Sequence, residues 1–141
     1  MELSIESQST IAETSLPPKS RKEDWEIEWE KCKHLIDKAI DTQDSYTISD
    51  VEDKIRHGLF HLWSGKKSAM VTGFAEYPQF KALNLIFCGG DYSELEEMLP
   101  SIEHFARNNG CKRLYGGGRK SWLRKIKHLG FEDAYLIKKD L

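Results

Sequence analysis

Hydrophobic and polar positions first follow a helical period. Apolar residues over 25–40 recur every three or four positions, which is typical of an amphipathic helix that ends near Asp41. A shorter helix is predicted next, because Ser49 and Glu52 have the spacing of a capping box. Gly58 is the expected stop of this second helix. Its apolar face is predicted to consist of Val51, Ile55 and Leu59.

The middle of the chain changes to a β-type pattern. Three segments rich in β-branched and aromatic residues, 59–63, 68–77 and 81–87, are separated by short turns. Consecutive strands with short connections predict an antiparallel meander. The following segment, 88–91, contains Gly89 and Gly90 and is expected to break the sheet.

The last third of the chain alternates between helix and strand. A helix is predicted from Tyr92 or Ser93 to about Asn108, with a kink or break at Pro100. The remaining elements are a strand at 113–115, a glycine turn at 116–118, a helix over 122–129 that stops at Gly130, and a strand over 131–138. This order predicts a mixed α/β fold with helices on both faces of one sheet.

Length and composition fit a single domain with a terminal tail. The chain has 141 residues, of which 39% are hydrophobic, and this is enough to bury a core. Residues 1–20 are polar and contain Pro17 and Pro18 without an apolar period, so we expect a tail at 1–20 and a domain at 21–141. If this tail is ordered, we expect the cause to be a bound protein partner or a neighbouring subunit.

Several classes of protein are disfavoured by the sequence. No apolar run approaches the roughly 20 residues of a membrane span, and the polar, acidic first ten residues predict no signal peptide. Cys32, Cys88 and Cys111 lack a metal-type spacing, so reduced thiols in a cytoplasmic protein are expected. His57 and His61 are four residues apart, but a glycine interrupts the helix between them, and no metal site is expected.

The charge is distributed unevenly. The totals, 23 acidic residues against 21 Lys and Arg, leave a net charge of −2, which argues against a general nucleic-acid binder. Acids dominate between Glu23 and Asp53, whereas residues 112–128 contain no acid. The basic side chains of that segment are Lys112, Arg113, Arg119, Lys120, Arg124, Lys125 and Lys127. They suit either a solvated helix face or a local site for a phosphate-bearing partner.

The element order and several short motifs resemble the GNAT superfamily of N-acetyltransferases. The segment 127–132, Lys-His-Leu-Gly-Phe-Glu, is similar to the terminal helix, Gly-Phe pair and strand of that superfamily. A wider set of motifs resembles small bacteriophage-encoded GNAT-like proteins over residues 24–139: Leu62-Trp63, 68–72, 89–91, Gly110-Cys111 and 118–123. The resemblance implies a GNAT-like fold with a central, mostly antiparallel sheet, acetyl-CoA as the cofactor and an amine as the acceptor.

The resemblance also assigns a cofactor site. In the superfamily, acyl-CoA enters a split beside the strand that follows the meander, and its pyrophosphate rests on the next helix N-terminus. The matching residues are Cys88, Gly89, Gly90, Tyr92 and Ser93, with Arg119, Lys120 and Arg124 for the phosphates. The usual family loop, an Arg or Gln before Gly-x-Gly or Gly-x-Ala, is missing, and Asp91 stands where a phosphate would arrive. The alternative is a turn at Gly89–Gly90, a helix cap by Asp91 or Ser93, and basic residues that dock an acidic protein or nucleic-acid phosphates.

The catalytic positions of the family are only partly matched. The tyrosine that commonly acts as general acid is replaced by Ile126, and a common asparagine is replaced by Arg119. The candidate substitutes are Tyr115 or Tyr135 for the acid, and Glu76, then His61, for the base.

Two functions therefore stay open. The first is an acyl-CoA-dependent N-acyltransferase of phage origin that modifies a host or phage amine in the host cytoplasm. The second is a catalytically degenerate GNAT-like protein that serves as a virion-associated or assembly component.

Overall fold

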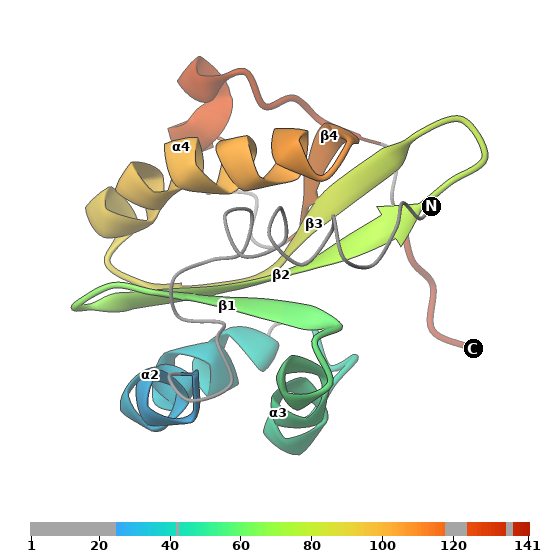
Figure 1. Ribbon diagram of the computed structural model, residues 1–141. Helices are drawn as coiled ribbons and strands as arrows, with labels where there is room; N and C mark the ends of the chain where they lie inside the picture. Colours follow the sequence, from blue (N-terminus) through green and yellow to red (C-terminus); the bar gives the residue numbers. More distant parts are fainter. Residues whose placement is uncertain (1–24, 42, 118–123, 135–136) are drawn as a thin grey trace, which may run out of the picture.

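The computed structural model describes residues 25–41, 43–117, 124–134 and 137–141. Within these ranges a four-stranded sheet separates two helices on one face from one helix on the other (Figure 1). The predicted mixed α/β architecture with helices on both faces is therefore confirmed. No helix within the described ranges has the length and apolar character needed to cross a membrane. The division into a tail at 1–20 and a domain at 21–141 stays a prediction.

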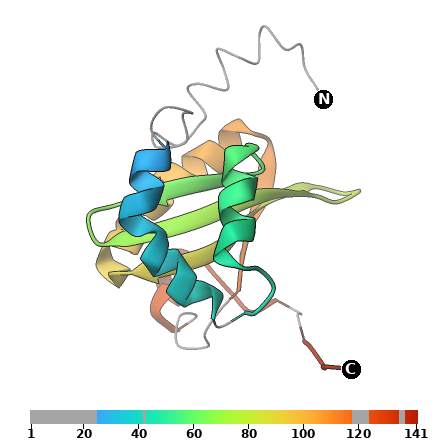
Figure 2. The same ribbon diagram turned by 90° about the horizontal axis from the view of Figure 1, so that it is seen from below.

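The first two helices, α2 (Trp25–Ile40) and α3 (Ile48–Arg56), lie side by side against one face of the sheet (Figure 2). The predicted amphipathic period of α2 is confirmed. Its buried stripe consists of Trp25, Trp29, Cys32, Ile36 and Ile40. Because this stripe faces the strands, it fixes α2 over the middle of the sheet.

The predicted cap of α3 at Ser49 is wrong by two residues. The N-cap is Thr47, whose hydroxyl accepts from the Asp50 N–H at 3.1 Å, while the Asp50 carboxylate accepts from the Thr47 N–H at 2.9 Å. The earlier start lets Ile48 pack against the core. Leu59 falls outside the helix and is 60% exposed, because Gly58, at φ +74°, has already ended it as predicted.

The predicted meander is confirmed by β1 (Phe60–Ser64), β2 (Ser68–Glu76) and β3 (Lys81–Gly90), which pair antiparallel in chain order. The expected break at 88–91 is wrong, because β3 continues to Gly90. Ser68 pairs with Gly90, so β2 supplies backbone partners along the whole glycine-containing end. The fourth strand, β4 (Cys111–Gly116), is parallel to β3.

Helix α4 (Tyr92–Asn108) covers the second face of the sheet and continues through Pro100. The expected kink or break therefore does not divide the helix. Pro100 is exposed, so the carbonyl group that loses its N–H donor at this position can be satisfied by water. The buried face of α4 consists of Leu95, Leu99, Ile102, Phe105 and Ala106.

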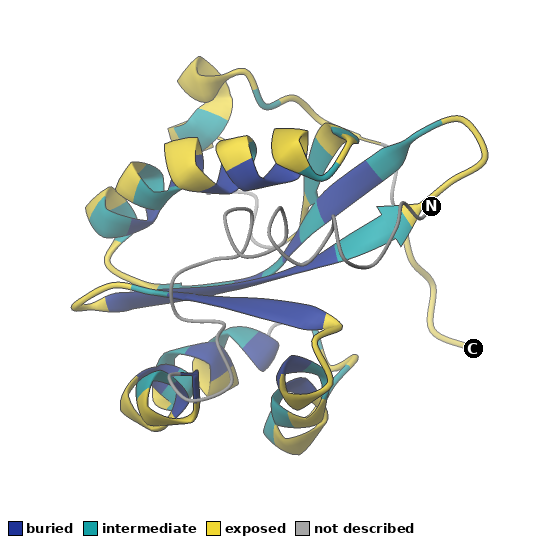
Figure 3. Ribbon diagram, viewed as in Figure 1, coloured by how far each residue is buried: buried dark blue, intermediate teal, exposed yellow. Residues whose placement is uncertain are grey.

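Buried residues lie along the strands and along the helices on both sides of the sheet (Figure 3). Their side chains form two cores, one on each face of the sheet. The core under α2 and α3 includes Leu62, Val71 and Phe87. The core under α4 includes Met70 and Leu83. The inner strands are buried on both faces, which is why their sequences contain almost continuous apolar runs.

The end of the chain departs from the prediction. Residues 124–126 are helical and lead into a 3₁₀ turn, η1 (Lys127–Leu129), which Gly130 ends at φ +97° as predicted. Trp122 and Leu123 lie outside the described residues. The closing strand expected over 131–138 is wrong for the described residues of that segment, none of which is in a strand. Ile137 is 90% exposed, and its β-branched side chain cannot form a strand without a paired neighbour.

Candidate functional site

The two parallel strands form a fork. Their pairing runs from Lys81 opposite Cys111 to Leu85 opposite Gly116, where β4 ends. Strand β3 continues to Gly90, so no strand within the described residues pairs with its last five residues on the β4 side. The backbone groups that point to that side are therefore available to another extended chain.

A β-bulge marks the point where the fork opens. Thr72 pairs with Leu85 and Val71 pairs with Phe87, so Ile86 is an extra residue in β3. The carbonyl oxygen of Ile86 accepts a hydrogen bond from Gln43 Nε2 at 3.0 Å. Gln43 thus satisfies one backbone group at the fork, and the bulge re-aims the strand beyond it.

A cleft of about 1550 Å³ adjoins the fork between α4, the strands and residues 124–134. Its apolar wall includes Leu85, Cys88 and Leu95. Burial raises the pKa of the Cys88 thiol to about 12, so this cysteine is an uncharged part of the wall and not a thiolate. Cys88, Tyr92 and Arg124, all expected at the cofactor site, are thus brought to one cleft.

Gly89 and Gly90 are required by packing. A Cβ on Gly89 would overlap the carbonyl oxygen of Leu35 in α2, and one on Gly90 would overlap that of Lys67 in the β1–β2 turn. Gly90 also has φ +104°, which other residues rarely adopt. The two glycines therefore allow α2 and the β1–β2 turn to approach β3, and this close approach explains them without a phosphate.

The N-terminus of α4 is partly occupied by the chain's own carboxylates. Asp91 caps the helix by accepting from the Glu94 N–H at 3.1 Å, as one of the two readings of the sequence expected. Glu94 accepts from the Lys67 N–H at 2.8 Å and from the Ser68 hydroxyl, and these bonds lower its pKa, the Ser68 bond most. Ser93 is exposed, and its side chain has no hydrogen-bond partner among the described residues. An incoming phosphate meets two carboxylates here, which weakens the attraction of the helix dipole.

Tyr92 connects α4 to the segment that forms the other wall of the cleft. Its Oη lies 2.6 Å from Glu96 Oε1 and 3.0 Å from the Lys125 carbonyl oxygen. The hydrogen bond to Glu96 raises the pKa of the phenol to about 12. His128 Nε2 lies 3.5 Å from the same Glu96 oxygen. Glu96 and His128 were not predicted from the sequence. The four-residue spacing of Tyr92 and Glu96 could have indicated a contact between these two side chains, since it places them one helical turn apart.

Tyr115 lines the cleft one residue before β4 ends, but its ring packs at the β2–β3 hairpin, and Glu76 lies away from the fork. The Tyr115 ring packs 6.2 Å from Tyr77 and 6.3 Å from Phe80, at the β2–β3 hairpin, and its Oη accepts from Arg113 at 2.9 Å. Glu76 is exposed opposite Lys81, at the opposite end of β3 from Gly90. Arg119, Lys120 and Tyr135 lie outside the described residues.

His61 is a core residue. It is 4% exposed, and its Nδ1 lies 3.0 Å from Thr72 Oγ1, which also accepts from Trp63 Nε1 at 3.0 Å. Burial, and then the charge of Lys81, lower the pKa of His61 to about 4. An acceptor amine cannot reach this imidazole while α4 covers it, so the structure does not support the expected role as a base. Within the described residues, no three His, Cys, Asp or Glu side chains come together in a way that could hold a metal ion.

Comparison with known proteins supports the fold. No family model and no curated protein matches the sequence. A solved structure described as the crystal structure of a probable acetyltransferase matches with a TM-score of 0.59 and 10% sequence identity. The match covers 79% of this chain and 89% of the other. At this identity the likeness concerns the fold alone, and the chain has the acetyltransferase-like fold that the resemblance in its sequence implied.

Proposed function

We propose that the protein binds acyl-CoA in the cleft beside the β3–β4 fork and transfers the acyl group to an amine. The observation that carries this proposal is the fork itself, because β3 extends five residues beyond the end of its parallel partner. The pantetheine arm of CoA contains amide groups that can hydrogen-bond to such a strand, as an added peptide strand does. The apolar wall at Leu85, Cys88 and Leu95 suits the non-polar parts of that arm.

The phosphate groups of acyl-CoA fit this cleft less well than its pantetheine arm does. Three basic residues were assigned to the phosphates: Arg119, Lys120 and Arg124. Of these, Arg124 lies within the described residues, where it is exposed at the cleft. Asp91 and Glu94 oppose an anion at the start of α4. We therefore expect acetyl-CoA to bind with modest affinity that depends strongly on Arg124 and on salt.

Tyr92 replaces Tyr115 as the proposed general acid. Its phenol contacts the carbonyl oxygen of Lys125, directly beside Ile126, where the family resemblance expects a tyrosine. A pKa of about 12 keeps the phenol protonated at neutral pH. When the amine forms its C–N bond and the C–S bond breaks, Tyr92 is the proton donor for the leaving thiolate. Glu76 is far along the sheet, so the acceptor is proposed to react as the free amine.

Calorimetric titration with acetyl-CoA tests the cleft. Arg124→Glu is expected to weaken binding at least about tenfold, because it reverses a charge that faces the phosphates. Lys38→Glu is the matched control, since Lys38 is exposed on α2 across the sheet, and binding should not change. Absence of binding at millimolar acetyl-CoA, or equal binding by both variants, contradicts the proposal.

A second test separates binding from catalysis. Tyr92→Phe should lower the turnover of acetyl-CoA with an amine panel while leaving acetyl-CoA binding unchanged, whereas Tyr115→Phe should lower neither. Loss of turnover in Tyr115→Phe with normal turnover in Tyr92→Phe would reverse the assignment.

The second candidate function is a catalytically degenerate GNAT-like protein of a phage, used in assembly or on the virion. Ile126, the Asp91 cap and the packing role of Gly89 and Gly90 favour it, because each replaces a feature of a working CoA site. A partner protein or neighbouring subunit for residues 1–20 belongs to this proposal. Mass spectrometry of purified particles decides it, and absence of the protein from them counts against it.

A further inference from the structure

Arg113 is held by aromatic rings and not by acids. Its guanidinium carbon lies 4.4 Å from the centre of the Phe80 ring and 5.7 Å from that of Tyr115. One of its nitrogens donates to Tyr115 Oη at 2.9 Å. Tyr77 completes the group, 5.3 Å from Phe80 and 42% exposed. We call Tyr77, Phe80, Arg113 and Tyr115 the aromatic–arginine cluster.

The cluster combines the β2–β3 hairpin with β4. Leu114 packs into the core under α4, so its neighbours Arg113 and Tyr115 point to the opposite face of the strand. On that face α2 packs on β2 and β3 while α3 packs on β1, and the cluster lies beyond both helices. Among the described residues neither helix covers the cluster, in which Tyr77 and Arg113 are exposed and Phe80 and Tyr115 are partly exposed.

Two other described arginines use their N–H groups on carboxylates, whereas exposed Arg124, like Arg113, has no carboxylate partner among the described residues. Arg56 bonds to Glu52 and Asp53, and Arg107 bonds to Glu103. Arg113 has one hydrogen bond, to a neutral phenol, and no carboxylate partner among the described residues. A guanidinium has five N–H donors, so most of those of Arg113 are available. Because the rings already fix its plane, binding an anion costs little ordering of the side chain.

We propose that the aromatic–arginine cluster binds a small aromatic anion, with its carboxylate or phosphate on Arg113 and its planar ring against Tyr77. The cluster supplies one cation, which matches one anionic group. A polynucleotide needs a cation for each bound phosphate, and exposed Glu76 next to Tyr77 disfavours a polyanion. Arg113 and Tyr115 also line the cleft proposed for acyl-CoA, but the proposal does not require that acyl-CoA binds there.

NMR titration of the full chain tests the proposal. The probes are adenosine monophosphate against adenosine for the phosphate source, and N-acetyltryptophan against its neutral amide for the carboxylate source. At least one anion should shift the backbone amide signals of Tyr77, Phe80 and Arg113 to Tyr115. Its neutral counterpart, and inorganic phosphate alone, should bind at least about tenfold more weakly.

Variants locate the ligand. Arg113→Gln should weaken binding of the anion at least about tenfold, and Arg107→Gln, which removes an exposed arginine of α4, should not change it. If Arg113→Gln fails to fold, the proposal is tested by comparing the binding of charged and neutral probes to the unmodified chain. The proposal is overturned if no anion shifts these signals, if neutral probes bind equally, or if folded Arg113→Gln binds normally. It is also overturned if a single-stranded oligonucleotide binds far more tightly than the mononucleotide.

Discussion

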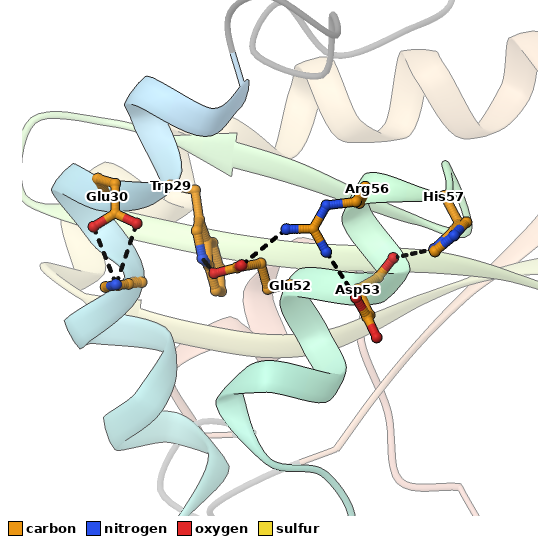
Figure 4. A network of polar contacts seen from close by, with 7 residues as sticks. Trp29, Glu30, Glu52, Asp53, Arg56 and His57 are labelled. Atoms are coloured by element: carbon orange, nitrogen blue, oxygen red, sulfur yellow. Dashed lines mark hydrogen bonds and ion pairs between the residues drawn. The ribbon is translucent and has the colours of Figure 1, made fainter.

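The two faces of the sheet satisfy buried tryptophans in different ways. On the α2–α3 face, Trp29 Nε1 donates to Glu52 Oε1 at 2.6 Å (Figure 4). The other oxygen of Glu52 accepts from Arg56 at 3.0 Å. Trp29 is buried, but Glu52 lies at the rim, where its carboxylate remains partly hydrated and paired.

On the α4 face, the corresponding partner is neutral and fully enclosed. Trp63 Nε1 donates to Thr72 Oγ1, and the same hydroxyl contacts His61 Nδ1. Thr72 has no exposed surface, and an ionised group there would lose its hydration without a counter-ion. In this protein, the indole N–H is thus paired with a carboxylate where that carboxylate is partly exposed to water, and with a neutral hydroxyl where the partner is fully buried.

The largest expected effect is on the enclosed face. Phe105 contacts the rings of His61, Trp63 and Phe74, so Phe105→Ala opens a cavity beside the polar group. We expect a loss of about 4 kcal/mol in the free energy of unfolding, measured with urea. Ile27→Ala, at a side chain that is 61% exposed, is the control and should change it by less than about 0.5 kcal/mol. Equal effects of the two changes would show that α4 is not packed as described.

We expect low pH to lower the free energy of unfolding through protonation of His61. Its pKa is about 4 in the folded protein against 6.5 when unperturbed, so between these values the unfolded chain binds a proton that the folded chain does not. Stability is therefore complete above pH 6.5 and falls as the pH is lowered towards 4, by about 3 kcal/mol.

Urea unfolding at a series of pH values measures this slope. His61→Gln, which retains a hydrogen-bonding group without titrating in this range, should flatten it, and His104→Gln, at an exposed histidine of α4, should leave it unchanged. A slope that persists in His61→Gln assigns the acid sensitivity to other groups.

On the α2–α3 face, we expect a substitution at the Trp29–Glu52 pair to cost less stability than the loss of Phe105. Trp29→Phe removes the bond to Glu52 but keeps the ring, and we expect a loss of about 1.5 kcal/mol. The same bond is the main reason that the pKa of Glu52 is lowered, so this pKa should rise in Trp29→Phe when followed by NMR. An unchanged Glu52 titration would remove the indole as its cause.

The smallest effect concerns the corrected cap of α3. Thr47→Ala should cost about 1 kcal/mol, whereas Ser49→Ala should cost less than about 0.5 kcal/mol, because the hydroxyl of Thr47 makes the cap bond. Thermal unfolding compares the two variants. A larger loss for Ser49→Ala would restore the cap that the spacing of Ser49 and Glu52 suggested.

Part of the candidate site could be read from the sequence. The family resemblance assigned Cys88 and Tyr92 to the cofactor site, and both line the cleft. It could not show what surrounds Tyr115, which also lines the cleft, or Glu76, since strand periodicity indicates which face a side chain occupies but not what packs beside it. The Tyr115 ring packs against Tyr77 and Phe80 of the hairpin, and Glu76 is the last residue of β2, opposite Lys81.

The sequence by itself determined the local elements: the stripe of α2, the meander and the glycine stops at 58 and 130. These features depend on neighbours within a few residues, where periodicity and turn chemistry act. Tertiary structure decided the extension of β3 to Gly90 and the absence of a strand among the described residues of 131–138. Each depends on whether distant segments supply or withhold a hydrogen-bond partner. The fork and the absence of a carboxylate partner for Arg113 arise in the same way, because both are defined by partners that the described residues do not provide.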